Sequence, residues 1–220
     1  MVNITIYIEG GAQSENPAVL TVDNSSVFRE NFHKLFSQKL SSAEFNLRIK
    51  PFGPIQGTKK MLERIEIQRI NGVVLIDLDA PKEERNNRLT WYNPSDRTKI
   101  FFMIQEMEAW ILSQTDKIEV FGRNEGLTRK RTDEDIKTHS LLKDKHPEEI
   151  PKPVDVKLDT ILKEYFDVVK IKRGKRGNKA KRYSKAKDGP KLIGLLELQN
   201  LMQCFDEAKR LVDYINISSR

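Results

Sequence analysis

Cysteine, histidine and long apolar runs are scarce in this sequence of 220 residues. The single cysteine, Cys204, excludes an internal disulfide and is typical of a reducing compartment, so we expect a cytoplasmic protein. No stretch approaches the roughly 18 to 20 uninterrupted apolar residues of a membrane span. The first residues alternate between apolar and polar types instead of pairing basic residues with an apolar run. We therefore expect no signal peptide and no membrane association.

Positive charge is concentrated in one part of the chain. The formal net charge is +7, yet the segment from Lys170 to Lys191 holds eleven Lys or Arg residues and only one acid, Asp188. This segment, which we call the basic arm, carries 11 − 1 = +10, so the other residues sum to 7 − 10 = −3. Lys and Arg bind phosphates and a tyrosine can stack on a base. The arm predicts nucleic-acid contact, with a merely solvated charged loop as the alternative; the side chains expected to bind are those of Lys172, Arg173, Lys175, Arg176, Lys181, Arg182, Tyr183 and Lys185.

The first half of the chain alternates between strand and helix patterns. Strands are expected at about 3–8, 45–49, 73–76 and 99–104. The segments between and after them carry apolar residues at helical spacing. This alternation predicts an α/β fold with a mostly parallel sheet flanked by helices, over residues 1–115.

The sequence pattern of the second half differs from that of the first. Apolar residues repeat at helical spacing around 158–166 and again from 192 onward. We therefore expect residues 116–220 to form a helical C-terminal lobe, packed as one unit with the sheet. The basic arm is expected as a loop or hairpin between its helices.

Three acidic residues follow predicted strands. Glu9 follows the first strand, and Asp77 and Asp79 follow the buried run at 73–76. Ligands of parallel α/β sheets bind beyond the carboxyl ends of the strands, and an i, i+2 pair in an extended segment points both carboxylates the same way. Such carboxylates suit Mg²⁺ or Mn²⁺ together with substrate phosphate. The alternative is a helix cap or a turn. Glu106, further on, is interpreted as a surface charge.

Four segments resemble a known family. They are Ile6-Tyr7-Ile8-Glu9-Gly10-Gly11, Val74 to Pro81, Met103 to Trp110, and Glu148-Glu149-Ile150-Pro151-Lys152. Together they are similar to a bacterial family of domains of unknown function, number 4276, and to the Toprim domains of topoisomerases, primases and overcoming-lysogenization-defect nucleases. The resemblance implies a Toprim-like catalytic centre, with Glu108 completing a metal shell of Glu9, Asp77 and Asp79. It also implies a partner ATPase and a role in anti-phage defence.

The combined expectation is a nuclease that hydrolyses phosphodiester bonds of DNA or RNA with Mg²⁺ or Mn²⁺. Its catalytic and metal-binding residues are expected to be Glu9, Asp77, Asp79 and Glu108, and Lys185 and Lys187 could reach this centre. Two alternatives stay open. One is a non-catalytic nucleic-acid-binding subunit, and the other is a phosphatase of the haloacid-dehalogenase type, which also uses an Asp-x-Asp pair after a strand. The oligomeric state is not predicted.

Overall fold

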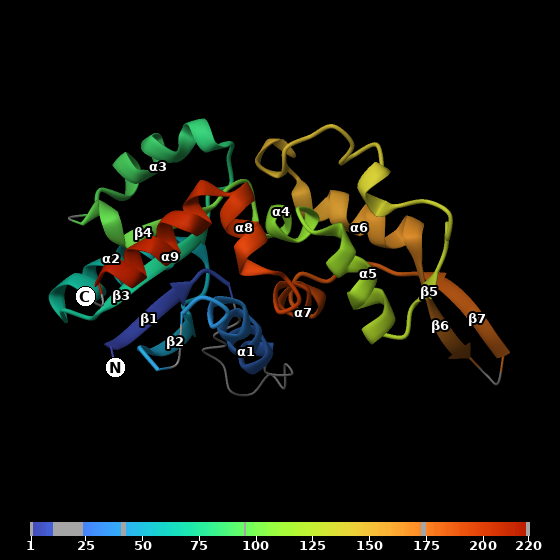
Figure 1. The fold of residues 1–220 in the computed structure, drawn as a ribbon, viewed down its shortest axis with the longest axis horizontal. Coiled ribbons are helices and arrows are strands. Elements are labelled where there is room, and N and C mark those ends of the chain that lie inside the picture. Colours follow the sequence, from blue (N-terminus) through green and yellow to red (C-terminus); the bar gives the residue numbers. More distant parts are fainter. Residues whose placement is uncertain (1, 11–23, 41–42, 95, 173–174, 219–220) are drawn as a thin grey trace.

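A parallel four-stranded sheet is the centre of the computed structural model (Figure 1). The structure describes residues 2–10, 24–40, 43–94, 96–172 and 175–218. Neighbouring strands are parallel throughout, in the order β2 (Phe45–Pro51), β1 (Val2–Ile8), β3 (Gly72–Asp77) and β4 (Ile100–Met103). These strands confirm the four segments expected from the sequence. Every residue of β3 is buried, which explains its continuous apolar run.

The helices of the first half connect these strands. Because the sheet is built outward from β1 in both directions, the handedness of parallel crossovers places α1 on one face and α2 and α3 on the other. The helices of this half are α1 (Asn24–Phe36), α2 (Thr58–Ile67), α3 (Arg85–Tyr92) and α4 (Met107–Leu112), with short 3₁₀ turns at Ile55–Gly57, Lys82–Glu84 and Arg97–Lys99. The parallel sheet with flanking helices confirms the predicted fold class.

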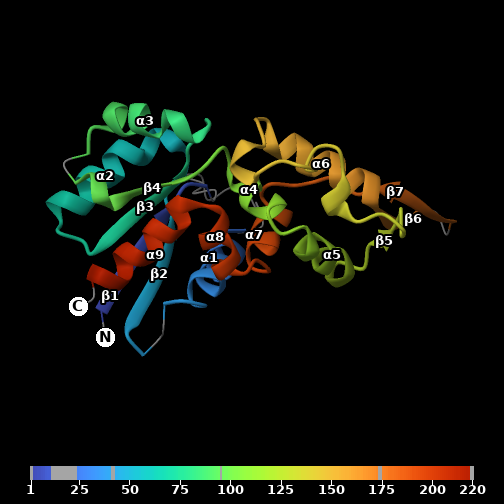
Figure 2. The same cartoon turned by 45° about the horizontal axis from the view of Figure 1, so that its top comes forward.

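The second half contains a small antiparallel sheet as well as helices. Its strands are β5 (Thr128–Arg129), β6 (Phe166–Lys172) and β7 (Lys175–Ala180). The pattern around 158–166 is mainly helix α6 (Val154–Tyr165), but Phe166 begins a strand instead of ending the helix. The β-branched residues Val168, Val169 and Ile171 were the signal for that strand. Part of the basic arm is therefore the hairpin β6–β7, which projects from one end of the molecule in Figures 1 and 2.

The remaining helices bring the chain back to the first sheet. They are α5 (Thr115–Asn124), α7 (Asp188–Ile193), α8 (Leu198–Cys204) and α9 (Asp206–Ser218), with 3₁₀ turns at Ile136–Thr138 and Pro147–Glu149. Helix α7 packs on α1, and α9 packs along β4, where Figures 1 and 2 both show it. The lobe is therefore in contact with the sheet through its last helices. Among the described residues, no helix is long and apolar enough to cross a membrane.

Helix α9 also covers the edge of the sheet. The carboxylate of Glu207 accepts a hydrogen bond from the Phe102 backbone N–H at 3.1 Å, and Arg210 Nη2 donates to the Ile100 carbonyl at 2.6 Å. Both backbone groups belong to β4, the last strand of the sheet. An uncovered edge strand exposes unpaired backbone groups to other chains. The two α9 side chains satisfy those groups at this edge.

Candidate functional site

Glu9 and Asp77 meet at the carboxyl ends of the neighbouring strands β1 and β3. Glu9 Oε2 accepts a 3.1 Å hydrogen bond from the Asp77 backbone N–H. Gly10 and Gly53 are held by mutual backbone hydrogen bonds just beyond β1 and β2, and both have positive φ angles, of 102° and 89°. Such backbone angles favour glycine. The glycines close the ends of these two strands and leave Glu9 directed toward β3.

Asp77 is buried and contacts two other parts of the chain. Its Oδ1 accepts a 2.8 Å hydrogen bond from the Met107 N–H at the start of α4, and its Oδ2 lies 3.3 Å from Lys185 Nζ. The first contact means that Asp77 does act as a helix cap, for a helix thirty residues later in the chain. The second contact joins it to the basic arm, and so the cap does not account for the whole carboxylate.

Glu108 faces Asp77 across the Lys185 ammonium group. Its side chain is fully buried in the first turn of α4. Tyr183 donates a 2.8 Å hydrogen bond to Glu108 Oε1, and Lys185 Nζ lies 3.4 Å from Glu108 Oε2. That Oε2 atom has no hydrogen-bond partner. A buried carboxylate oxygen with only a long ionic contact is costly, and buried charges are normally paired or coordinate metals.

Asp79 diverges from Asp77. Strand β3 ends at Asp77, and Asp79 has a φ of 58°, in the left-handed region, so the pair does not lie in one extended segment. Its carboxylate contacts Lys152 Nζ at 2.6 Å, and the same ammonium lies 3.3 Å from Glu106 Oε1. The expectation that both aspartates point the same way from an extended strand was therefore wrong. Asp79 and Asp77 contact different lysines.

Glu106 is a structural residue of the site and not a surface charge. It is buried, and its Oε2 accepts hydrogen bonds from the backbone N–H groups of Val154 at 2.9 Å and Asp155 at 3.2 Å, at the start of α6. A carboxylate is favourable at the N-terminus of a helix because it meets unpaired N–H groups and the positive end of the helix dipole. Glu106 thus joins the end of β4 to the second half of the chain.

Burial is the main cause of raised pKa values at three of these acids, Glu9, Asp77 and Glu108. Burial, opposed by the hydrogen bond from Asp77, raises the pKa of Glu9 to about 7, with the charge of Asp79 adding to the rise. Burial also raises the pKa of Asp77 to about 7 against the opposing charge of Lys185, and the charges of Glu108, Glu9 and Asp79 contribute to the rise. Burial raises the pKa of Glu108 in the same direction. The four predicted acids are therefore close enough to interact, and a cation among them is favoured.

The segment that carries Tyr183 and Lys185 is fixed by two other carboxylates. Asp188 Oδ2 accepts hydrogen bonds from the Ser184 N–H at 2.9 Å and from Lys181 Nζ at 2.7 Å. Asp159 Oδ1, on α6, accepts from the Tyr183 N–H at 2.8 Å. These bonds hold the chain after β7 so that Tyr183 and Lys185 turn toward the acids.

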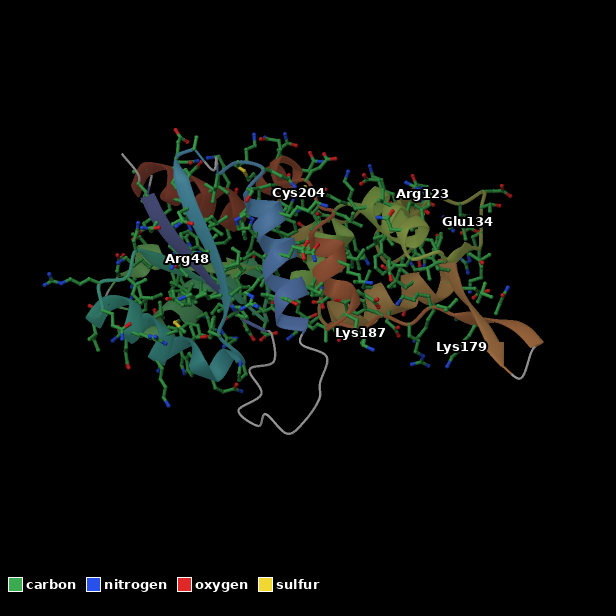
Figure 3. The ribbon with its side chains drawn as sticks, turned by 90° about the horizontal axis from the view of Figure 1, so that it is seen from below. Arg48, Arg123, Glu134, Lys179, Lys187 and Cys204 are labelled. Carbon is green, nitrogen blue, oxygen red and sulfur yellow. The ribbon has the colours of Figure 1, made fainter. Side chains whose placement is uncertain are left out.

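The residues of the basic arm that were predicted to bind nucleic acid differ in their exposure and in their partners. Tyr183 packs against the core and donates its hydroxyl to Glu108, so it is not free to stack on a base. Lys181 is largely buried in its ion pair with Asp188, whereas Arg182 is exposed. Figure 3 shows Lys179 on the hairpin and Lys187, also exposed, beside α7. Arg173 and the side chains of Lys172, Lys175 and Arg176 lie outside the described residues.

Lys152, Glu106 and Asp188 were not assigned to the site from the sequence. Lys152 and Glu106 stand in the segments that carry the family resemblance, and that position was the available signal. Asp188 is the only acid in the basic arm. An isolated opposite charge within a run of one sign was the signal for a buried ion pair.

The donor set fits a magnesium-like ion held by two carboxylates. Within the part of the chain that the structure describes, no three His, Cys, Asp or Glu side chains form a group that could hold a metal. Mg²⁺, however, usually takes only one or two carboxylates together with water and substrate phosphate. Asp77 and Glu108 already share one cation, Lys185, and Glu108 Oε2 lacks a hydrogen-bond partner. The two carboxylates supply the oxygen ligands and the negative charge that Mg²⁺ prefers.

Comparisons with known proteins place the chain in a family. No curated protein and no solved structure matches it. One family does match, over residues 24–216, which is most of the chain. That range includes Asp77, Asp79, Glu108, Lys152 and Lys185, and begins after Glu9. The chain belongs to the family described as "Domain of unknown function (DUF4276)".

Proposed function

We propose that the chain is a Toprim-like nuclease that hydrolyses phosphodiester bonds of DNA or RNA with Mg²⁺ or Mn²⁺. The observation that carries the proposal is the junction of Asp77, Glu108 and Lys185. In it, the buried carboxylate of Asp77, at the end of β3, and that of Glu108, in the first turn of α4, meet one lysine of the basic arm. The junction combines ligands for a hard cation with a positive charge for a phosphate. Both are what a phosphodiester substrate needs at the reacting centre.

Each residue has a role that follows from its position. Asp77 and Glu108 would hold the ion, with Glu9 and Asp79 beside it. When bound, such an ion polarises a phosphoryl oxygen and lowers the pKa of a bound water molecule. Glu9, with a pKa of about 7, can exchange a proton near neutral pH. Lys185 is only half-buried and can meet a phosphate oxygen from the solvent side.

The rest of the basic arm would bind the nucleic-acid backbone. Arg182 and Lys179 are exposed and lie a few residues before Lys185 in the chain. A nucleic-acid backbone bound to these two side chains would run toward Lys185. From the family resemblance we also propose a partner ATPase that controls cleavage in anti-phage defence. This part would be tested by co-purification and by asking whether cleavage requires ATP.

A second candidate is a non-catalytic nucleic-acid-binding subunit. It is favoured by the ion pairs that already engage Asp77, Glu108 and Asp79 with lysines. In that case the carboxylates would only position the arm.

The deciding experiment is cleavage of plasmid DNA, single-stranded DNA and total RNA with Mg²⁺, Mn²⁺ or a chelator. It is run with and without co-purified partners. We expect metal-dependent cleavage that falls at least about 100-fold in Asp77→Asn, since a metal ligand is lost. The matched control is Asp213→Asn, an exposed aspartate on α9 that is paired with Lys209. Unchanged cleavage by Asp77→Asn would refute the assignment. Hydrolysis of small phosphate esters without nuclease activity would favour the phosphatase alternative.

A further inference from the structure

Lys185 occupies the position of a shared counterion between two buried acids. Its Nζ lies 3.3 Å from Asp77 Oδ2 and 3.4 Å from Glu108 Oε2. Glu108 is fully buried and Asp77 nearly so, while the Lys185 side chain is 53% exposed. Both contacts are longer than a strong charge-assisted hydrogen bond, which is about 2.7–2.9 Å. The ammonium therefore balances charge without making a short bond to either carboxylate.

The other lysine of the site is held differently. Lys152 makes a 2.6 Å contact with Asp79, and its second partner, Glu106, is already fixed by two backbone N–H groups of α6. Lys152 is thus part of a connected structural network. Lys185 instead contacts the two side-chain oxygens that are not used for backbone hydrogen bonds or for Tyr183. These are the oxygens that a metal ion would take.

We propose that Lys185 competes with the metal ion for Asp77 and Glu108. The lysine leaves these two carboxylates when nucleic-acid phosphate is bound. This inference rests on the proposed function and adds a coupling between its two ligands. A divalent ion and the ammonium group cannot occupy the same place between Asp77 and Glu108. A phosphate at the mouth of the site offers the released ammonium group a new partner.

The consequence is reciprocal coupling between metal and nucleic acid. If nucleic acid draws Lys185 away, it raises the affinity for the metal, and by linkage the metal raises the affinity for nucleic acid by the same factor. In the absence of nucleic acid the metal binds weakly because it must displace the ammonium group. The site is then inactive until both ligands are present.

The position of Lys185 in its segment permits this movement. The backbone is anchored at Ser184 by Asp188, whereas the Lys185 side chain extends from the anchored turn toward solvent and the acids. Movement of the side chain alone is enough to exchange partners. The fold of the segment does not have to change.

The test is the affinity for Mn²⁺, measured by isothermal titration calorimetry on the whole chain. Wild type is compared with Lys185→Gln, with Lys185→Arg, which keeps the charge, and with Lys209→Gln as a surface control. Titrations are done alone and with 20-nucleotide duplex DNA or single-stranded RNA whose phosphorothioate linkages resist hydrolysis. Circular dichroism establishes that each variant is folded.

We expect Lys185→Gln to bind Mn²⁺ about tenfold more tightly than wild type without nucleic acid, within the usual range of such couplings. Lys185→Arg and Lys209→Gln should remain within about twofold of wild type. The enhancement of Mn²⁺ affinity by the oligonucleotide should also be smaller in Lys185→Gln than in wild type. Equal or weaker Mn²⁺ binding by Lys185→Gln overturns the inference, whereas the proposed metal site still stands if the wild type binds Mn²⁺. An absence of Mn²⁺ binding in every variant overturns the proposed function as well.

Discussion

The hydroxyl group of Tyr183 donates a 2.8 Å hydrogen bond to Glu108 Oε1, across 75 residues of sequence. This bond joins the segment after the hairpin to the first turn of α4. It also satisfies one oxygen of a fully buried carboxylate whose other oxygen has no hydrogen bond. The segment of the basic arm that follows the hairpin is therefore part of the candidate site.

Tyr183→Phe should destabilise the protein by about 1–3 kcal/mol, because neither carboxylate oxygen of Glu108 would then accept a hydrogen bond from a side chain. Urea unfolding at pH 8 measures the effect. Tyr214→Phe is the control, since that half-buried ring packs 5.7 Å from the ring of Phe101 and lies away from the site. Equal stability of Tyr183→Phe and wild type would contradict the role given to this bond.

Gly189→Ala should also disturb the site, although alanine is the better helix former by about 1 kcal/mol. A Cβ atom at this position in α7 would lie 2.8 Å from the Tyr183 hydroxyl oxygen and 2.9 Å from Met107 Cε. The methionine end can move aside, but the hydroxyl cannot without lengthening its bond to Glu108. We expect a lower melting temperature and weaker Mn²⁺ binding. Gly177→Ala on β7 meets no atom within 4 Å and should behave like wild type.

The metal-free protein should lose stability as the pH rises from about 4 to 8. The folded-state pKa values of Glu9 and Asp77 are raised to about 7 from 4.5 and 3.8, so the folded state binds more protons than the unfolded state in this interval. Their stabilising effect is present below the unfolded pKa values and is lost as the pH passes through about 7. One pKa unit corresponds to about 1.4 kcal/mol. Because Glu9 is partly exposed, solvent reduces its contribution, and we expect a total loss on the order of a few kcal/mol.

Denaturant titrations at pH 5, 6, 7 and 8 measure this slope. Asp77→Asn should flatten it, and Mn²⁺ should stabilise the wild type most at pH 8, where the acids are ionised. Asp213→Asn, at the surface of α9, should keep the wild-type slope. A slope that is unchanged in Asp77→Asn would show that this carboxylate is not the source.

Arg182 and Lys181 should affect nucleic-acid binding differently. Arg182 is exposed, and Arg182→Gln should reduce the slope of log affinity against log salt by roughly 0.9 if it contacts one phosphate of duplex DNA. Lys181 is paired with buried Asp188, so Lys181→Gln should lower thermal stability with little change in that slope. Fluorescence anisotropy between 50 and 200 mM salt separates the two. A reversed order of effects would refute the division of the arm into binding and anchoring residues.

Glu207→Gln should destabilise the edge of the sheet by about 1–3 kcal/mol. The carboxylate accepts from the Phe102 N–H and pairs with Arg85 at 2.6 Å and Arg210 at 2.7 Å. Asp213→Asn on the same helix breaks only an exposed pair and should change stability by less than about 0.5 kcal/mol. Thermal unfolding followed by light scattering measures both stability and association through β4. Similar results for the two variants would show that α9 does not protect this edge.

The sequence determined the elements whose pattern is local. The alternation and burial of 3–8 and 73–76 predicted β1 and β3, and the order of strands and helices predicted a parallel sheet. Because parallel strands end at the same edge, the sequence predicts that Glu9 and Asp77 lie close together. A hairpin was one of the two forms expected for the basic arm, but the start of β6 was missed because the helical spacing of α6 continues into Phe166, although Val168 and Val169 were present to indicate a strand.

Which charged side chains meet depends on the tertiary structure. Asp79 turns away because its backbone is left-handed, and in that conformation its N–H donates a 2.8 Å hydrogen bond to the Gln105 carbonyl beyond β4. Lys185 and Tyr183 reach the acids because Asp188 and Asp159 anchor their segment, contacts that no spacing in the sequence encodes. Local pattern fixes the direction of a strand and the burial of a helix face. The partner of a charged side chain is set by elements far apart in the chain, which the packed fold brings together.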